Sequence, residues 1–303
     1  FLARIIAGFT GGNISVAQAY ITDVTDEKNR ARGLGLIGAA FGLGFIIGPA
    51  VGGILSQWGY DVPSFLAAAL SLFNFILVVV WLPESLTAER KAALANNQQA
   101  PFTLKAMIQA MRRPLVGPLL HTRFIYGLAF SGFTAIFTLY ALKRFGLDST
   151  QTGYILAYIG LISVITQGGL IRIFTARFTD WQLIIGSVFG LGIGFFGWAA
   201  APRVVFLLIA LLPIAMSAGI LNTVINSAIS KSVVRAEVGG TLGLSAALES
   251  LTRVISPAVM GVILAKWGSI APGLIAGALM LWLVTYVWRY VSRSPVAVET
   301  IAN

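Results

Sequence analysis

A carboxylate and a guanidinium lie four residues apart in a long apolar stretch, where a charge needs either a function or a partner. Glu249 and Arg253 both fall within residues 240–265, a run long enough to cross a membrane. On an α-helix this spacing puts both side chains on one face, within reach of each other. A charge so deep in a membrane helix is costly, so Glu249 either forms a permanent ion pair or takes up and releases a proton. Arg4, within residues 2–22, is a third candidate for proton coupling or ion pairing.

Two apolar stretches also carry a stripe of small and polar residues at helical spacing. One stripe lies in residues 2–22 and the other in residues 204–229. Such a face is unfavourable against lipid, so it is expected to line a watery cavity or to hydrogen-bond to a neighbouring helix. The cavity-lining residues predicted from these stripes are Gly11, Ser15, Gln18, Asn222 and Asn226.

A third stretch, residues 115–142, has aromatic side chains on one broad face. Aromatic rings can receive a lipophilic or cationic substrate, so we predict that Phe130 and Phe137 line a binding cavity. An aromatic stripe that packs in the core or against lipid is equally consistent with the spacing. Arg123 and His121 lie one to two turns inside the same stretch, and we expect both to extend towards the membrane surface.

The composition is that of an integral membrane protein. Of 303 residues, 57% are hydrophobic and 11% are charged, whereas a soluble domain is about 25% charged. This excludes a soluble enzyme. Nine apolar runs approach the roughly 20 residues that a membrane helix needs, and they span residues 2–22, 33–56, 64–83, 115–142, 151–171, 183–200, 204–229, 240–265 and 273–291.

Lys and Arg are distributed unevenly among the segments that connect these runs. Alternate connections, which include residues 84–114 and the tail after residue 288, hold 14 of the 21 basic residues, and the opposite connections hold 4. Basic residues concentrate in cytoplasmic segments, which places the first set in the cytoplasm and explains the net charge of +10 without nucleic acid. The lack of cysteine, the single histidine and the absence of a phosphate-binding loop motif argue against a metal site, a cofactor and an ATP-driven motor.

The sequence repeats itself at a distance of 208 residues. Leu-Gly-Leu at 34–36 falls on the same triplet at 242–244, and after a one-residue slip Trp-Gly-x-x-x-Pro at 58–63 falls on the same pattern at 267–272. The first three runs therefore repeat as the last three, in the same orientation, and the middle three have no partner. We expect two six-helix halves, with three helices of about 90 residues in total preceding Phe1.

The run 33–56 contains a glycine series with one proline. Gly44, Gly48 and Gly52 recur every four residues and form a stripe on which another helix can pack closely, and Pro49 kinks the helix. We expect this stripe to act as a gate between the two halves, with ordinary helix packing as the alternative. The complete signature is Gly35, Gly44, Gly48, Pro49, Gly52 and Gly53.

Two six-helix halves joined by a long cytoplasmic loop resemble the major facilitator superfamily. The glycine and proline spacing over residues 35–53 matches the fifth-helix signature of the family's proton-coupled exporters, and residues 1–90 are similar to tetracycline-efflux and multidrug antiporters. The resemblance implies a cavity-lining role for Gln167. The histidine that tetracycline exporters carry shortly before this glutamine is replaced by Ser163, which argues against tetracycline as the substrate.

The sequence divides into parts that follow this resemblance. Residues 1–83 are predicted to form part of the N-terminal half, 84–114 the central loop, 115–291 the C-terminal six-helix half and 292–303 a cytoplasmic tail. A cytoplasmic charge cluster flanks the first three runs and forms either an ion-pair lock or ordinary solvated loop charge; its members are Asp23, Arg30, Arg32, Glu84 and Arg90.

We therefore expect an all-α protein of the cell membrane, with nine of the twelve membrane helices of the superfamily, and a transporter rather than an enzyme. The predicted function is proton-coupled efflux of small lipophilic or cationic compounds by alternating access. Its partners are the substrate, protons and the lipid bilayer, with no nucleic acid, cofactor or metal, and the protein is expected to act as a monomer. The alternatives are a sugar or metabolite symporter or facilitator of the same fold and, less favoured, a membrane scaffold that does not transport.

Overall fold

The computed structural model describes residues 13–25, 36–37, 40, 43–44, 47–48, 51–59, 61–85, 104–233 and 238–291. Every regular element within these residues is a helix, so the all-α prediction is confirmed for them. Seven helices of the described part are long and apolar enough to cross a membrane, and they correspond to seven of the nine predicted runs. The other two runs, 2–22 and 33–56, are only partly among the described residues.

The elements follow one another as a series of long helices. The first part of the chain contributes α2 (Asn13–Val24), η1 (Ser56–Trp58) and α4 (Val62–Trp81). The second part contributes α6 (Leu104–Met111), α7 (Val116–Phe145), α8 (Ser149–Ile165), η2 (Thr166–Leu170), α9 (Ile171–Arg177), α10 (Asp180–Ala200), α11 (Val204–Lys231), α12 (Val238–Trp267) and α13 (Ala271–Tyr290). Together α8, η2 and α9 form one continuous membrane span, in which η2 is a π-helical turn.

The sharp reversal between α7 and α8 follows from local sequence. Gly146 ends α7 in the left-handed conformation, at φ 68°, which glycine adopts without steric cost. Two residues later the Asp148 side chain accepts a hydrogen bond from the Gln151 amide at 2.7 Å, and the Asp148 amide donates to the Gln151 side chain at 3.1 Å. This reciprocal cap starts α8, so the two helices run in opposite directions.

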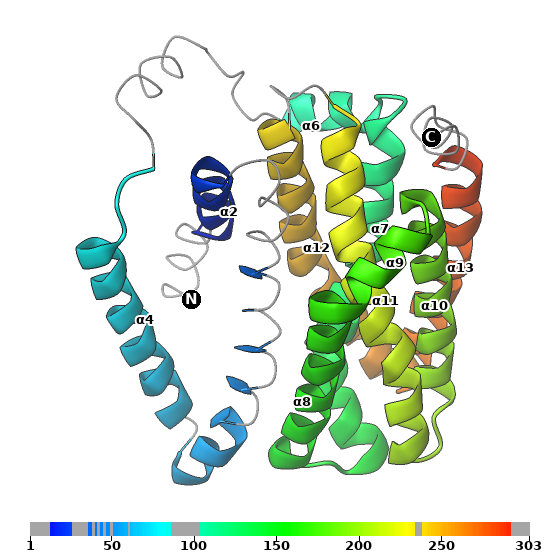
Figure 1. Ribbon diagram of the computed structural model, residues 1–303. Coiled ribbons are helices and arrows are strands. Elements are labelled where there is room, and N and C mark those ends of the chain that lie inside the picture. The colour runs from blue at the N-terminus through cyan, green and yellow to red at the C-terminus, as the bar shows by residue number, and fades with distance from the viewer. Residues whose placement is uncertain are drawn as a thin grey trace.

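The two copies of the repeated Trp-Gly-x-x-x-Pro pattern have similar backbone conformations. Gly59 and Gly268 follow the two repeated tryptophans, and both have positive φ, at 137° and 82°. The repeated prolines, Pro63 and Pro272, then lie in the first turn of α4 and α13, where a proline costs no hydrogen bond. Figure 1 shows that α4 and α13 run in the same direction, as a repeat of unchanged orientation requires.

The helices α7 to α13 pack closely because glycines stand where the helices meet. A Cβ atom at Gly194 of α10 would lie 2.5 Å from the Ile214 side chain of α11. A Cβ atom at Gly273 of α13 would lie 2.9 Å from the Phe195 carbonyl oxygen of α10. Small residues of this kind let membrane helices approach each other, since dispersion contacts rather than the hydrophobic effect hold them together in lipid.

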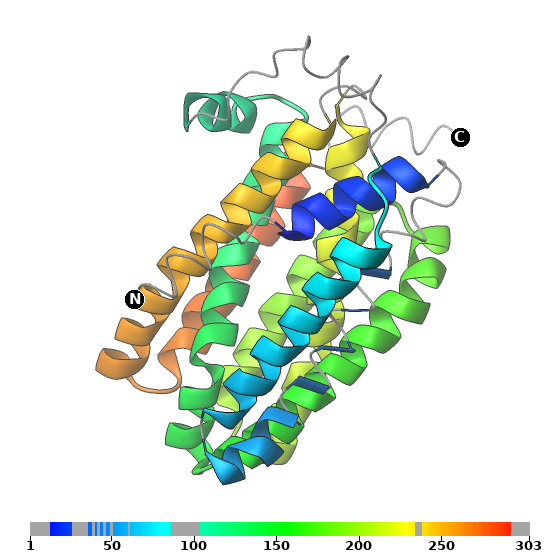
Figure 2. The ribbon, with the colours of Figure 1, turned by 90° about the vertical axis from the view of Figure 1, so that its left-hand side faces the viewer.

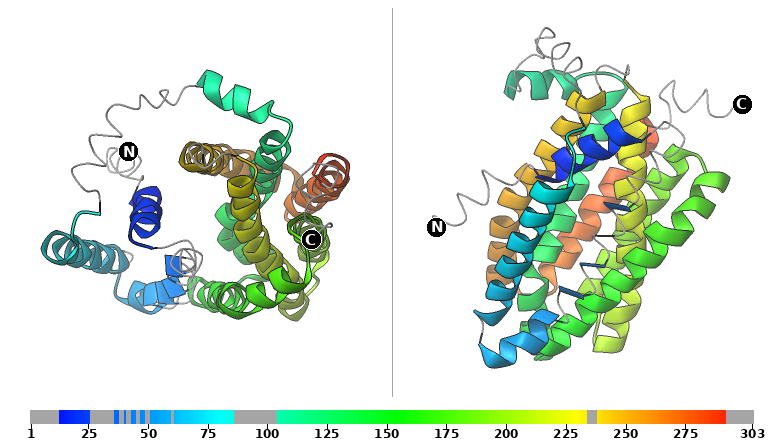
Figure 3. Two further views of the ribbon diagram at one scale, coloured as in Figure 1. Left: turned by 45° about the horizontal axis from the view of Figure 1, so that its top comes forward. Right: turned by 60° about the vertical axis from the view of Figure 1, so that its left-hand side comes forward.

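The first part of the chain lies beside this helical group. In Figures 1 and 3, α2 and α4 lie on one side and α7 to α13 on the other. α2 contacts α12. Within α4 no residue is buried, which suits an apolar helix that faces lipid. The short helix α6 lies across one end of the group, where it leads into α7 (Figure 2).

Candidate functional site

The charged residues of the C-terminal helices meet in one cluster. The Glu249 carboxylate of α12 accepts a hydrogen bond from the Arg253 guanidinium at 2.7 Å, through Oε1. Its other oxygen, Oε2, accepts from Nη2 of Arg123, which extends from α7. Nη1 of the same arginine donates to Oδ1 of Asn222 on α11. The cluster therefore joins three helices, α7, α11 and α12.

The approach of α7 to α12 depends on a glycine one turn after Arg123. A Cβ atom at Gly127 would lie 2.8 Å from Oγ1 of Thr252, too close for any real side chain. The Thr252 hydroxyl itself donates to the backbone oxygen of Glu249 at 2.7 Å, so it stays against its own helix. A residue larger than glycine at position 127 would move α7 away from α12, and with it the Arg123 guanidinium from the carboxylate.

The members of the cluster differ strongly in exposure. The Arg123 side chain is 5% exposed, that of Glu249 is 34% exposed and that of Arg253 is 65% exposed. Both carboxylate oxygens have a guanidinium partner, which offsets the cost of taking the carboxylate out of water. With two positive groups and one negative group, the cluster carries one excess positive charge.

The expectation that Arg123 and His121 extend to the membrane surface is wrong for Arg123. This side chain turns inward because a carboxylate and an amide from two neighbouring helices accept its hydrogen bonds. His121 is half-buried, its Nδ1 lies 2.8 Å from the Gly117 backbone oxygen, and its ring meets that of Tyr286 at 6.0 Å between centroids. The contacts of His121 are thus to its own helix and to α13.

The aromatic face of α7 also differs from the expectation. Phe137 is 1% exposed and packs in the core against Phe133 and Tyr140, so it does not line a cavity. The Tyr140 hydroxyl donates to the Trp198 backbone oxygen at 2.9 Å, which fixes this aromatic group between α7 and α10. Phe130 is half-buried and stacks on the Tyr126 ring at 5.5 Å. Phe133 and Tyr140, the two rings that contact Phe137, pack in turn against Trp198 of α10.

The polar residues predicted on α11 and in η2 are all half-buried. Asn222 belongs to the charged cluster, and Asn226 is half-buried one turn further along α11. Gln167 lies in η2 with its side chain against α11, since a Cβ atom at Gly219 would lie 3.2 Å from Cγ of Gln167. π-Helical turns are rare and often mark functional sites. A cavity-lining role for Asn222, Asn226 and Gln167 stays a prediction.

The glycine signature is only partly among the described residues. A Cβ atom at Gly44, Gly48 or Gly52 would meet no atom of the described part within 4 Å, so the close packing expected of this stripe is not formed there. At Gly53 a Cβ atom would lie 3.7 Å from the Thr150 Cα atom of α8. The contact with the C-terminal helices is thus made one residue beyond the stripe, and the gate stays a prediction.

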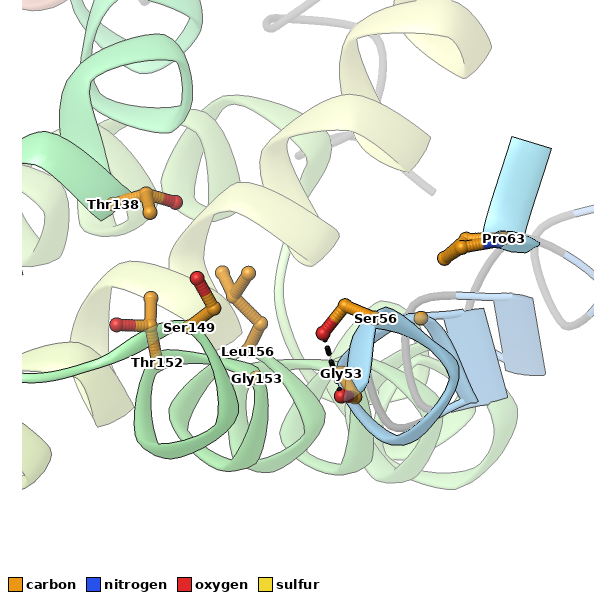
Figure 4. Close-up of a pocket in the computed structure, with 9 residues that line it drawn as sticks. Gly53, Ser56, Pro63, Thr138, Ser149, Thr152, Gly153 and Leu156 are labelled. Carbon is orange, nitrogen blue, oxygen red and sulfur yellow. Dashed lines mark hydrogen bonds between the residues drawn. The ribbon is translucent and has the colours of Figure 1, made fainter. Parts of the chain in front are cut away.

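A small cavity adjoins this contact. It has a volume of about 300 Å³ and lies between the segment 52–63 and the helices α7 and α8. Figure 4 shows Ser56 and Pro63 on one side and Thr138, Ser149 and Leu156 on the other. The Ser56 hydroxyl donates to the Gly53 backbone oxygen at 2.8 Å, so its proton is already engaged within its own helix. The reversal from α7 to α8 borders this cavity. The connection between these two helices is predicted to lie outside the cytoplasm, so the cavity lies at the outer end of the helices.

Several predicted residues lie where the structure says little or nothing of them. Those outside the described residues are Arg4, Gly11, Gly35, Pro49, Arg30, Arg32 and Arg90. The side chains of Ser15, Gln18 and Asp23 on α2 are likewise not described. Glu84 follows α4 and is exposed. The described part has a different ion pair on the predicted cytoplasmic side, in which Lys231 Nζ lies 2.8 Å from Asp180 Oδ2 and links α11 to α10.

Seven candidate membrane helices in the described part of the chain are those of a polytopic membrane protein, and comparison with known proteins identifies its family. The chain belongs to the Major Facilitator Superfamily, whose family model matches residues 1–246. It is therefore a multi-pass integral membrane protein. Membership in this family and the transporters among its relatives indicate a transporter rather than an enzyme.

The relatives include mammalian solute carriers and bacterial resistance proteins. Mouse (Mus musculus) solute carrier family 22 member 18 is 27% identical over 279 residues, covering 91% of this chain and 69% of its own. The class C tetracycline resistance protein of Escherichia coli is 31% identical over 299 residues, covering 94% and 71%. Multidrug resistance protein 2 of Bacillus subtilis (strain 168) is 26% identical, covering 95% and 72%.

A solved structure has the same fold. The crystal structure of the human organic anion transporter MFSD10 (TETRAN) matches with a TM-score of 0.73 and 23% sequence identity. The match covers 95% of this chain and 70% of the human protein. The major facilitator fold predicted from the sequence is thereby confirmed.

Proposed function

We propose that the protein is a secondary active transporter that exports small lipophilic or cationic compounds in exchange for protons, by alternating access. The observation that carries this proposal is the position of Glu249. Among the described carboxylates it is the one that lies inside a membrane helix, away from both ends of α12. Ionisable residues in such positions mark proton relays and substrate pathways.

The contacts of Glu249 suggest how an exchange could operate. Arg253 is well exposed and pairs with the carboxylate from its own helix, so it can leave Oε1 without disturbing the helix packing. A proton or a substrate then gains access to that oxygen. Two guanidinium groups repel a cation while both face the carboxylate, so a cationic substrate approaches only after Arg253 has moved. The lipophilic substrates are therefore favoured over the cationic ones.

The direction of transport is proposed from the relatives. Proteins named for tetracycline resistance and multidrug resistance are similar to this chain over more than nine-tenths of its length. Resistance by a membrane transporter requires export, and an exporter driven by the proton gradient must exchange substrate for protons. These names support efflux for this chain without fixing its substrate.

A second candidate is co-transport of an anionic solute with protons. It is favoured by the excess positive charge of the cluster, which attracts an anion. Protonation of Glu249 makes the cluster more positive and so promotes the binding of an anion. A proton and an anion would then move together, whereas a proton and a cation would compete.

Transport in liposomes distinguishes these functions. The full-length protein is reconstituted with an internal pH-sensitive dye, and a substrate gradient of ethidium, tetracycline or benzoate is imposed. Exchange predicts that protons move against the substrate, and co-transport predicts that they move with it. Glu249→Gln should abolish the proton movement in both cases. If Glu249→Gln moves protons as the unchanged protein does, the proposed coupling at this residue is wrong.

A further inference from the structure

We infer that Arg123 is a positioning residue that holds one oxygen of Glu249 throughout transport, so that only the other oxygen exchanges partners. The inference rests on the proposed proton coupling at Glu249 and assigns unequal parts to its two arginines. Arg123 fixes the carboxylate in place, and Arg253 is the partner that a proton displaces.

The two carboxylate oxygens lie in different surroundings. Oε2 bonds to Arg123, whose side chain is 5% exposed, and Oε1 bonds to Arg253, whose side chain is 65% exposed. A proton that arrives through water reaches Oε1 once Arg253 has moved. It does not reach Oε2 unless a buried guanidinium first leaves its site.

The Arg123 guanidinium is held on more than one side. Its Nη1 donates to Asn222 of α11 while its Nη2 donates to Glu249 of α12. The close contact of Gly127 with Thr252 keeps α7 against α12 just one turn away. If the carboxylate left, a buried positive charge would remain with one neutral partner, which is strongly unfavourable.

The attachment of Arg253 is much looser. In the described part of the chain its bond at 2.7 Å is to Glu249, four residues earlier on the same helix. A pair at this spacing lies within one helix, so it forms or breaks without any movement of the backbone. The exposed guanidinium can therefore turn away while Glu249 stays attached to α7.

Among the side chains that the structure describes, the ionisable groups around the carboxylate come from two helices. Arg123 and Tyr126 face it from α7 and Arg253 from its own helix α12, and α11 contributes the neutral Asn222. Replacing either arginine by glutamine removes one positive charge near the carboxylate. The buried Arg123 charge is screened less by solvent than the exposed Arg253 charge, so the two glutamine variants differ in charge effect as well as in position. The variant that separates the two causes is Asn222→Leu, which keeps both charges and removes the acceptor that orients Arg123.

The test measures proton release by the full-length protein in weakly buffered detergent when a transported compound is added, over a range of pH. We expect Arg123→Gln to lower the number of protons released at least tenfold. Arg253→Gln should retain at least a third of them, with the midpoint of the pH profile moved upward. Arg123→Lys should restore part of the release, because lysine supplies one donor for Oε2. The matched control is Ser250→Ala, since the Ser250 hydroxyl bonds to the Ala246 backbone oxygen and not to the cluster.

A second variant keeps the inference testable if Arg123→Gln does not fold. Asn222→Leu retains both arginines and the carboxylate but removes the acceptor that orients Arg123. It should lower the proton release at least threefold and broaden the pH profile. Equal release by Arg123→Gln and Arg253→Gln, or unchanged release by Asn222→Leu, would overturn the positioning role. Failure of the proposed function has a different signature, in which Glu249→Gln releases protons as the unchanged protein does.

Discussion

At the scale of single residues, the site depends on Glu249, whose carboxylate is the counter-ion of the buried Arg123 guanidinium. Glu249→Gln leaves the Arg123 charge in the protein interior without its counter-ion. Breaking a buried pair on one side typically costs about 3–5 kcal/mol, so the single variant should be markedly less stable. Glu249→Gln/Arg123→Gln should recover most of this loss, which thermal unfolding in detergent would measure. A double variant as unstable as the single one would contradict the pairing.

The sequence revealed one part of this site and not the other. The pair Glu249 and Arg253 is local, so helical spacing predicted it correctly. Arg123 is 126 residues from Glu249 and 99 residues from Asn222, and no local pattern links positions so far apart. A lone arginine near the end of a membrane helix commonly extends to the surface, and for that reason its inward direction was missed.

At the scale of helices, glycine determines which pairs lie close together. Gly127→Ala would place a methyl group 2.8 Å from the Thr252 hydroxyl, so α7 and α12 must separate. Overpacking of this kind costs roughly 1–3 kcal/mol, and here it should also weaken proton coupling because Arg123 moves with α7. Gly186→Ala is the matched control, since a Cβ atom there meets nothing within 4 Å in the described part of the chain. Equal stability and equal transport in the two variants would show that neither depends on the distance between α7 and α12.

The length of the apolar runs predicted the long helices well, because a membrane span must be apolar for about 20 residues. It did not predict which face of each helix is covered by a neighbour. The α7 aromatics show this, since the same stripe suits a cavity or a core, and only the packing of neighbouring helices around α7 decides that Phe137 is buried. The π-helical turn at Thr166–Leu170 likewise gives no periodic signal, and Gln167 was identified by resemblance alone.

At the scale of the whole molecule, the proposed alternating access requires the outer ends of the two parts to separate and rejoin. Gly53 and Thr150 are close enough for a disulfide, since a Cβ atom at Gly53 would lie only 3.7 Å from the Thr150 Cα atom. Residues 1–303 contain no cysteine, so Gly53→Cys/Thr150→Cys can form no other disulfide within them. We expect oxidation to stop transport and reduction to restore it, as measured in liposomes. Either single cysteine variant is the control, and unimpaired transport by the crosslinked protein would show that this contact does not open.

The long separation between Arg123 and Glu249 has a consequence for biosynthesis. Because α7 emerges from the ribosome well before α12, Arg123 has no Glu249 partner until 126 further residues have been synthesised. At about 5–20 residues per second, the wait lasts roughly 6–25 s. During that time the unpaired arginine opposes insertion of α7, by less than the roughly 2.5–3.5 kcal/mol of an arginine at the centre of a membrane helix, because Arg123 lies nearer the helix end. A nascent chain stopped before α12 should therefore hold α7 only loosely in the bilayer, and arrival of the late carboxylate should complete its insertion.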